Sequence, residues 1–138
     1  MKVVIDTNVF VSSVFGGLPG QVVELWFDGR LTLCLSEPVV TEYQRVLREV
    51  GAADEAEERA LIEAFASGEG VLYTADPPAI ESVSPDPDDD KFLECALELE
   101  ADRVVSGDSD LLELKSYMGI PILAPRELLE QIGEVPDG

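Results

Sequence analysis

Apolar residues recur along the chain in two alternating patterns, short β-branched runs and longer stretches with helical spacing. The first run, Lys2–Ile5, is followed by Asp6-Thr7-Asn8, residue types that cap helices, so a strand and then a helix are predicted. Further strands are predicted at 31–35, 71–73, 103–106 and 120–123. Because helical stretches alternate with these strands, we predict an α/β domain with a mainly parallel sheet of four to five strands, covered by helices on both faces.

The expected helices are bounded by capping and breaking residues. A Gly-Gly-Leu-Pro-Gly break at 16–20 precedes a helical stretch that stops at Asp28-Gly29. Ser36 is a plausible N-cap for a helix running to Val50, which places Glu42 one to two turns in. Other helices are predicted at 54–66, from about 89, at 108–117 and at 126–132, with a proline-rich loop at 76–88.

Length and apolar content indicate one folded domain. A chain of 138 residues, 46% of them hydrophobic, can build a single core, and we expect a domain at 1–132 with a flexible tail at 133–138. The apolar runs are far shorter than the roughly 20 residues that span a bilayer, so we expect a soluble, cytoplasmic protein. Cys34 and Cys95 each lie in an apolar pattern and are expected to be core thiols.

Charged composition narrows the possible chemistry. The chain has no histidine, which excludes Ser-His-Asp hydrolases, paired-histidine ribonucleases and histidine-ligated zinc enzymes. Its 29 acidic residues against 9 basic ones give a net charge of −20, which counts against binding a polyanion. Bound divalent cations and high salt would weaken that objection, and the scarcity of lysine is typical of proteins from salt-loving organisms.

Acidic side chains follow the carboxyl ends of predicted strands, where parallel sheets bind ligands. Asp6 ends the first strand, Asp108 follows the strand at 103–106, and Asp89 opens a helix, while Glu42 can point toward the same edge. Two carboxylates about 4 Å apart repel by roughly 4 kcal/mol at an effective dielectric constant of 20, so such a group needs protons or metal ions. Oxygen ligands suit Mg²⁺ and Mn²⁺, a pair of which can activate water and stabilise the leaving oxygen of a phosphodiester.

Four sequence blocks resemble the PIN-domain family. They are VIDTNVF at 4–10, SEPVVTEYQRVL at 36–47, DPDDDKFLECAL at 86–97 and VSGDSDLL at 105–112, and the resemblance extends from Met1 to about Leu129. It is closest to the VapC-like branch, the toxins of prokaryotic toxin-antitoxin systems. The resemblance implies an α/β/α sandwich, a Mg²⁺- or Mn²⁺-dependent ribonuclease acting on RNA, a cognate antitoxin protein and a homodimer.

The resemblance also assigns the metal-binding and catalytic acids to Asp6, Glu42, Asp89 and Asp108. Asp86, Asp88, Asp89 and Asp90 are all candidates for the third acid, and Asp89 is chosen because it lies three residues before Phe92, as in the family pattern. Asp110 is a candidate fifth acid, and Asn8 is a candidate for orienting Asp6. Lys91, beside the aspartate run, is a candidate phosphate contact.

Other interpretations of the acids remain open. Asp6, Asp89 and Asp108 could simply cap helices, and Glu42 could be a solvated helix residue. A phosphatase of the haloacid-dehalogenase type would use Asp6 as a covalent nucleophile, but it needs an acid two residues later, where Asn8 stands. A catalytically silent module that keeps the fold and binds a protein partner is the non-enzymatic alternative.

Overall fold

A six-stranded sheet forms the centre of the protein. The computed structural model describes residues 1–52, 54–80 and 87–133. The strand order is β3-β2-β1-β4-β6-β5, and every neighbouring pair is parallel except β5 with β6. The strands are β1 (Lys2–Ile5), β2 (Thr32–Ser36), β3 (Val71–Thr74), β4 (Arg103–Val105), β5 (Ser116–Tyr117) and β6 (Ile120–Leu123). The predicted α/β fold with a mainly parallel sheet is therefore confirmed.

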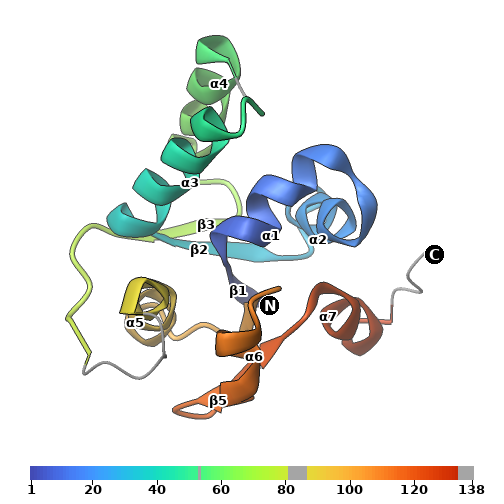
Figure 1. Ribbon diagram of the computed structural model, residues 1–138, viewed down its shortest axis with the longest axis vertical. Coiled ribbons are helices and arrows are strands. Elements are labelled where there is room, and N and C mark those ends of the chain that lie inside the picture. The colour runs from blue at the N-terminus through green and yellow to red at the C-terminus, as the bar shows by residue number, and fades with distance from the viewer. Residues whose placement is uncertain (53, 81–86, 134–138) are drawn as a thin grey trace.

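Helices flank the sheet on both faces. Figure 1 shows α3 and α4 above β2 and β3, and α5 below them, where α5 packs against β1, β2 and β4. The α-helices are α1 (Thr7–Ser12), α2 (Gly17–Phe27), α3 (Glu37–Glu49), α4 (Glu55–Ala66), α5 (Asp90–Glu98), α6 (Ser109–Leu114) and α7 (Pro125–Gln131), and the 3₁₀ helices are η1 (Ser13–Phe15) and η2 (Pro87–Asp89).

The predicted glycine-rich break at 16–20 is shorter than expected. Only Gly16 lies outside a helix, with φ of 85°, and α2 begins at Gly17. Pro19 therefore lies in the first turn, where a helix needs no backbone N–H donor, so proline costs no hydrogen bond there.

The prediction of a helix through 108–117 was wrong at its end, and the sheet has one strand more than expected. Lys115 has φ of 61° and ends α6, after which Ser116–Tyr117 form β5. Met118 and Gly119 make a two-residue turn with φ of 50° and 83°, the conformation that joins tight hairpins. Pairing of β5 with β6 therefore determines the structure of this segment, and helical spacing in the sequence does not indicate such pairing.

Some predictions concern residues beyond the described ranges. Most of the tail expected at 133–138 lies outside them, as does 81–86 of the proline-rich loop. The end of that loop is more regular than predicted, because residues 87–89 form η2.

The core lies between the central strands and the inner faces of the helices. Strands β1, β2 and β4 are buried on both faces, which is why their sequences are continuous apolar runs. Cys34 and Cys95 are both buried free thiols, as expected. Burial raises the pKa of Cys34 to about 11 and that of Cys95 to about 12.

Within the described residues, no single helix is long and apolar enough to cross a membrane. The bent pair formed by 7–15 and 17–27 would reach that length and apolarity together, and its inner residues, such as Phe10, Val22 and Trp26, are buried in the protein core.

The chain changes direction across the sheet between β1 and β4. From β1 it runs outward through β2 to β3, and from β4 it runs the other way to β6. Loops leaving the carboxyl ends of two such strands diverge and leave a crevice between them. Asp6 follows β1 and Asp108 follows β4 by three residues, so both lie at this crevice.

Candidate metal centre

Asp6 is held in a fixed orientation at the end of β1. The pairing of β1 with β4 continues through a hydrogen bond from the Asp6 N–H to the Val105 carbonyl, at 2.9 Å. The side chain caps α1, because Oδ1 accepts the N–H of Val9 at 2.9 Å. Oδ2 accepts the hydroxyl of Ser106 and the N–H of Gly107, the latter at 3.3 Å. The capping function expected for Asp6 and a position in the site therefore coexist.

Burial has an electrostatic cost at Asp6. The side chain is 3% exposed, and loss of solvation raises its pKa above the ordinary aspartate value. The hydrogen bonds from Ser106, Val9 and Gly107 oppose this rise, and repulsion from Asp108 adds to it. The protein thus places a carboxyl group where its anion is undersolvated, which favours the binding of a cation.

Asp108 and Asp110 are arranged by the start of α6. Asp108 is the N-cap, and its Oδ1 accepts the Asp110 N–H at 2.8 Å. The Asp108 N–H donates to the Ser106 hydroxyl oxygen at 2.9 Å. Ser106 therefore links the two acids, because the same hydroxyl donates to Asp6.

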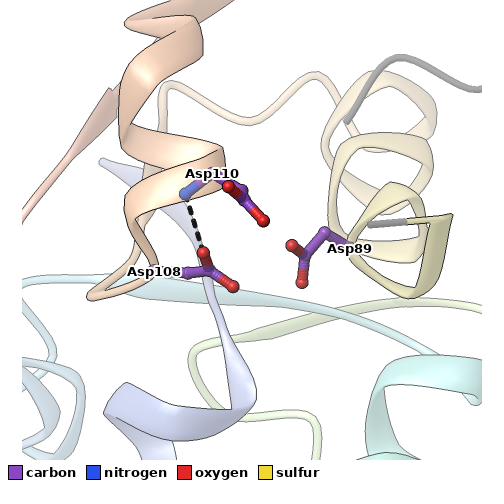
Figure 2. A group of neighbouring side chains, drawn as sticks. All are labelled: Asp89, Asp108 and Asp110. Atoms are coloured by element: carbon purple, nitrogen blue, oxygen red, sulfur yellow. Dashed lines mark hydrogen bonds between the residues drawn. The ribbon is translucent and has the colours of Figure 1, made fainter. Parts of the chain in front are cut away.

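Three carboxylates converge beside this link. One oxygen each from Asp89, Asp108 and Asp110 lie within 4.8 Å of one another, and Figure 2 shows Asp89 facing the other two across the space between η2 and α6. Asp89 is buried and stands at the N-cap position of α5. Its side chain makes no capping hydrogen bond to that helix. The cap interpretation of Asp89 is therefore not supported, and Asp110 lies with the predicted acids.

Glu42 reaches the site from α3. The buried side of this helix is formed by Val39, Tyr43 and Leu47, and the Tyr43 hydroxyl donates to the carbonyl of Ile5 at the end of β1. This contact places the neighbouring Glu42 beside the first turn of α1, where its Oε2 accepts the Thr7 hydroxyl. Its Oε1 lies 2.6 Å from the Lys91 ammonium and 3.7 Å from the Arg45 guanidinium.

A cavity of about 210 Å³ joins these groups. Its walls include all four predicted acids, Asp6, Glu42, Asp89 and Asp108, together with Thr7, Asn8, Arg45, Val46, Asp88 and Phe92. The structure therefore brings the four predicted side chains to one place. Their catalytic and metal-binding roles remain predictions.

The choice within the aspartate run agrees with this geometry. Asp88 and Asp89 line the cavity, and Asp89 also belongs to the converging group. Asp90 is buried but does not line the cavity, and the candidate Asp86 lies outside the described residues.

Sequence reasoning missed the residues that hold the acids. Ser106 is fully buried and was considered only as the end of a strand, and Thr7 only as a possible cap. A hydroxyl residue directly after a buried strand and two residues before an acid, as in Ser106-Gly107-Asp108, was the available signal. The pairing of Lys91 with Glu42 joins residues 49 positions apart, and no local pattern reports it.

The donor set fits a hard divalent cation. The converging side chains offer carboxylate oxygens, and the chain has no histidine to compete as a ligand. Asp6, with its raised pKa, borders the same cavity. Mg²⁺ and Mn²⁺ prefer such oxygen ligands, so the converging Asp89, Asp108 and Asp110 are suited to hold one, with Asp6 at the same cavity.

The chain is similar to known proteins over the region that forms this site. A family model described as "PIN domain" matches residues 2–110. The chain is also 28% identical to an uncharacterised protein of the archaeon Methanocaldococcus jannaschii, over 95% of this chain and 91% of the archaeal protein. The matched region contains every acid of the cavity.

Proposed function

Because the chain belongs to the PIN-domain family, we propose that it is a Mg²⁺- or Mn²⁺-dependent endoribonuclease. PIN domains are generally nucleases and typically bind divalent metal ions. The observation that carries the proposal is the gathering of Asp6, Asp89 and Asp108 around one cavity at the carboxyl edge of a parallel sheet. RNA is the substrate class that the sequence resemblance implies.

The protein's own side chains would supply position and charge. Asp6, Asp89 and Asp108 would hold the cation, with Asp110 close to the last two. A bound Mg²⁺ or Mn²⁺ would activate a water molecule and stabilise the leaving oxygen of the phosphodiester. Ser106 and the backbone of Gly107 keep the Asp6 carboxylate in one orientation, so little reorganisation is needed when the ligand binds.

Cleavage and metal binding test this proposal together. Wild type is compared with Asp6→Asn, Asp89→Asn and Asp108→Asn in Mn²⁺-dependent cleavage of a pool of single-stranded RNAs, and Mn²⁺ binding is measured by calorimetry. We expect each variant to lose at least about 100-fold in rate and to bind Mn²⁺ more weakly, since metal contacts supply several kcal/mol of transition-state stabilisation. Asp28→Asn, at the exposed end of α2, is the matched control.

The outcomes separate the alternatives. Full-rate cleavage by Asp6→Asn and Asp89→Asn would refute the site. A wild-type protein that neither cleaves RNA nor binds Mn²⁺ would favour the silent binding module. Turnover of a small phosphate ester without RNA cleavage would favour the phosphatase.

We further propose that the protein is the toxin of a toxin-antitoxin pair and works as a homodimer bound by its antitoxin. The support is the likeness of the four sequence blocks to that branch of the family. A groove of about 540 Å³ between α2, η1 and the α3–α4 pair adds a plausible contact surface, since exposed Val14 and Phe27 line it.

The toxin role has its own experiment. Expression of wild type should arrest growth and Asp6→Asn should not. Co-expression of a small reading frame, if one adjoins this gene, should restore growth. Light scattering of the purified protein tests the dimer. Growth unaffected by an active nuclease would contradict the toxin role alone.

A further inference from the structure

The candidate site must attract a polyanion although its walls are acidic. Asp6, Glu42, Asp88, Asp89 and Asp108 all border the cavity, in a chain whose net charge is −20. Among the described residues that line the cavity, Arg45 is the single cation, and Lys91 lies against Glu42 at its edge. Arg45 therefore borders the cavity itself, and Lys91 is held beside it through Glu42.

Glu42 differs from Asp6 in the groups that contact its carboxylate. Lys91 and Arg45 both contact Oε1, and the Thr7 hydroxyl occupies Oε2. The hydrogen-bond donors to the Asp6 carboxylate are neutral groups: a hydroxyl and two backbone N–H groups. A carboxylate already compensated by an ammonium at 2.6 Å gains little from a metal ion, whereas Asp6 gains much.

Lys91 is better placed than Arg45 to act on a ligand. The Lys91 side chain is 21% exposed and the Glu42 side chain is 14% exposed, so this pair is partly shielded from water. Arg45 is 57% exposed and also pairs with Glu49 at 3.0 Å along the same helix, as surface residues commonly do. An ammonium has three N–H donors, and the bond to Glu42 uses one of them.

We propose that Lys91 binds a phosphate of the nucleic-acid substrate, and that Glu42 is a positioning residue that holds the Lys91 ammonium at the cavity edge and does not bind the metal. This inference rests on the proposed nuclease function and revises the assignment of Glu42 as a ligand. It also accounts for how a chain of such acidity would admit RNA: the Lys91 ammonium and a metal ion, when bound, would act at short range, where salt screens least.

RNA binding and Mn²⁺ binding, neither of which needs turnover, test the two halves of the proposal. A labelled short single-stranded RNA is titrated by fluorescence anisotropy at several salt concentrations. Lys91→Gln should weaken binding about 10-fold, the typical loss for a charge-assisted hydrogen bond. It should also reduce the slope of log K against log salt by about 0.7, the loss of one phosphate contact to a single strand. Lys91→Arg should retain most of the affinity.

Lys115→Gln makes the same change of net charge at an exposed residue and is the control. Equal losses in Lys91→Gln and Lys115→Gln, or no loss in Lys91→Gln, would overturn the assignment of Lys91. Absence of RNA binding by wild type would also overturn it.

Calorimetry with Mn²⁺ decides the role of Glu42. Glu42→Gln should leave Mn²⁺ affinity within about 2-fold of wild type, and it should weaken RNA binding as much as Lys91→Gln does. Asp108→Asn should lose Mn²⁺ binding. A 10-fold or greater loss of Mn²⁺ affinity in Glu42→Gln would make it a ligand and refute the positioning role. Thermal unfolding of each variant checks its fold. A protein that binds RNA through Lys91 but cleaves none would remove the proposed function and leave this inference standing.

Discussion

Ser106 shows how much one buried hydroxyl contributes to the candidate site. It donates to the Asp6 carboxylate and accepts the backbone N–H of Asp108, so it links the segments that follow β1 and β4. Among the described residues, no buried polar side-chain atom lacks a hydrogen-bond partner. Removing this hydroxyl would take one hydrogen-bond donor from the Asp6 carboxylate. It would also leave the Asp108 N–H without its acceptor.

Ser106→Ala should therefore lower the free energy of unfolding by about 2 kcal/mol, since a lost bond to a buried carboxyl group exceeds the average hydrogen bond. It should also raise the pKa of Asp6 further, because the Ser106 hydrogen bond lowers that pKa. Urea denaturation without metal measures the stability. Ser116→Ala, exposed in β5, should change it by less than about 0.5 kcal/mol. Equal effects of the two changes would contradict the role given to Ser106.

Burial of the two thiols leads to a prediction about their reactivity and about the effect of pH on stability. With pKa values raised to about 11 for Cys34 and about 12 for Cys95, both are protonated and unreactive in the folded protein at pH 8. A disulfide reagent should label them only after denaturant is added. In the unfolded chain the thiols ionise with the ordinary pKa of 9.0. The stability that comes from keeping both thiols protonated in the fold is therefore complete below pH 9, and it falls as pH rises toward the pKa values of the folded protein. Rapid labelling of the native protein would contradict the burial.

At the scale of elements, α4 combines a capped N-terminus with a small buried face. Its N-terminus is a capping box. The Asp54 side chain accepts the Glu57 N–H at 2.8 Å, and the Glu57 side chain accepts the Asp54 N–H at 3.3 Å. Among its residues, Glu58 and Phe65 are buried, and Arg48 of α3 bonds Glu58 at 2.8 Å. A helix with so small a buried face depends on its cap.

Asp54→Ala should lower the free energy of unfolding by about 1 kcal/mol, because the Glu57 N–H in the first turn loses its side-chain acceptor. Urea denaturation followed by far-ultraviolet circular dichroism measures this. Glu63→Ala, in the exposed middle of α4, is the control and should be near neutral. An unchanged midpoint in Asp54→Ala would show that the cap contributes nothing.

At the scale of the whole molecule, the net charge of −20 acts against compactness. Like charges repel over a Debye length of roughly 10 Å at 0.1 M salt and roughly 3 Å at 1 M, so salt should relieve self-repulsion. The expectation that the chain suits a salt-rich environment rests on this relief of self-repulsion.

Raising KCl from about 0.1 M to about 1 M should therefore raise the melting temperature by several degrees. Calorimetry measures it. A variant with Glu63→Gln, Glu69→Gln and Glu98→Gln, all exposed, should be more stable at low salt and less sensitive to added salt. A melting temperature that falls with salt would mean that ion pairs outweigh repulsion.

The sequence by itself determined the strand–helix alternation and the parallel sheet, because continuous apolar runs and capping residues are local signals. The choice of the candidate acids rested on predicted strand ends together with the resemblance of the four sequence blocks to a family. It placed Asp6, Asp89 and Asp108 at element ends correctly, since each position follows from its neighbours along the chain. It was wrong about the hairpin at β5, where pairing with β6 outweighs helical spacing.

Only the tertiary structure decided how these acids are held and compensated. Ser106 reaches Asp6 across 100 residues, Lys91 reaches Glu42 across 49, and Asp110 joins Asp89 through the approach of α6 to η2. Such contacts depend on how strands and helices pack, which no local pattern encodes. Sequence reasoning therefore identified which carboxylates gather, whereas burial and pairing in the fold distinguish the undersolvated Asp6 from the cation-paired Glu42.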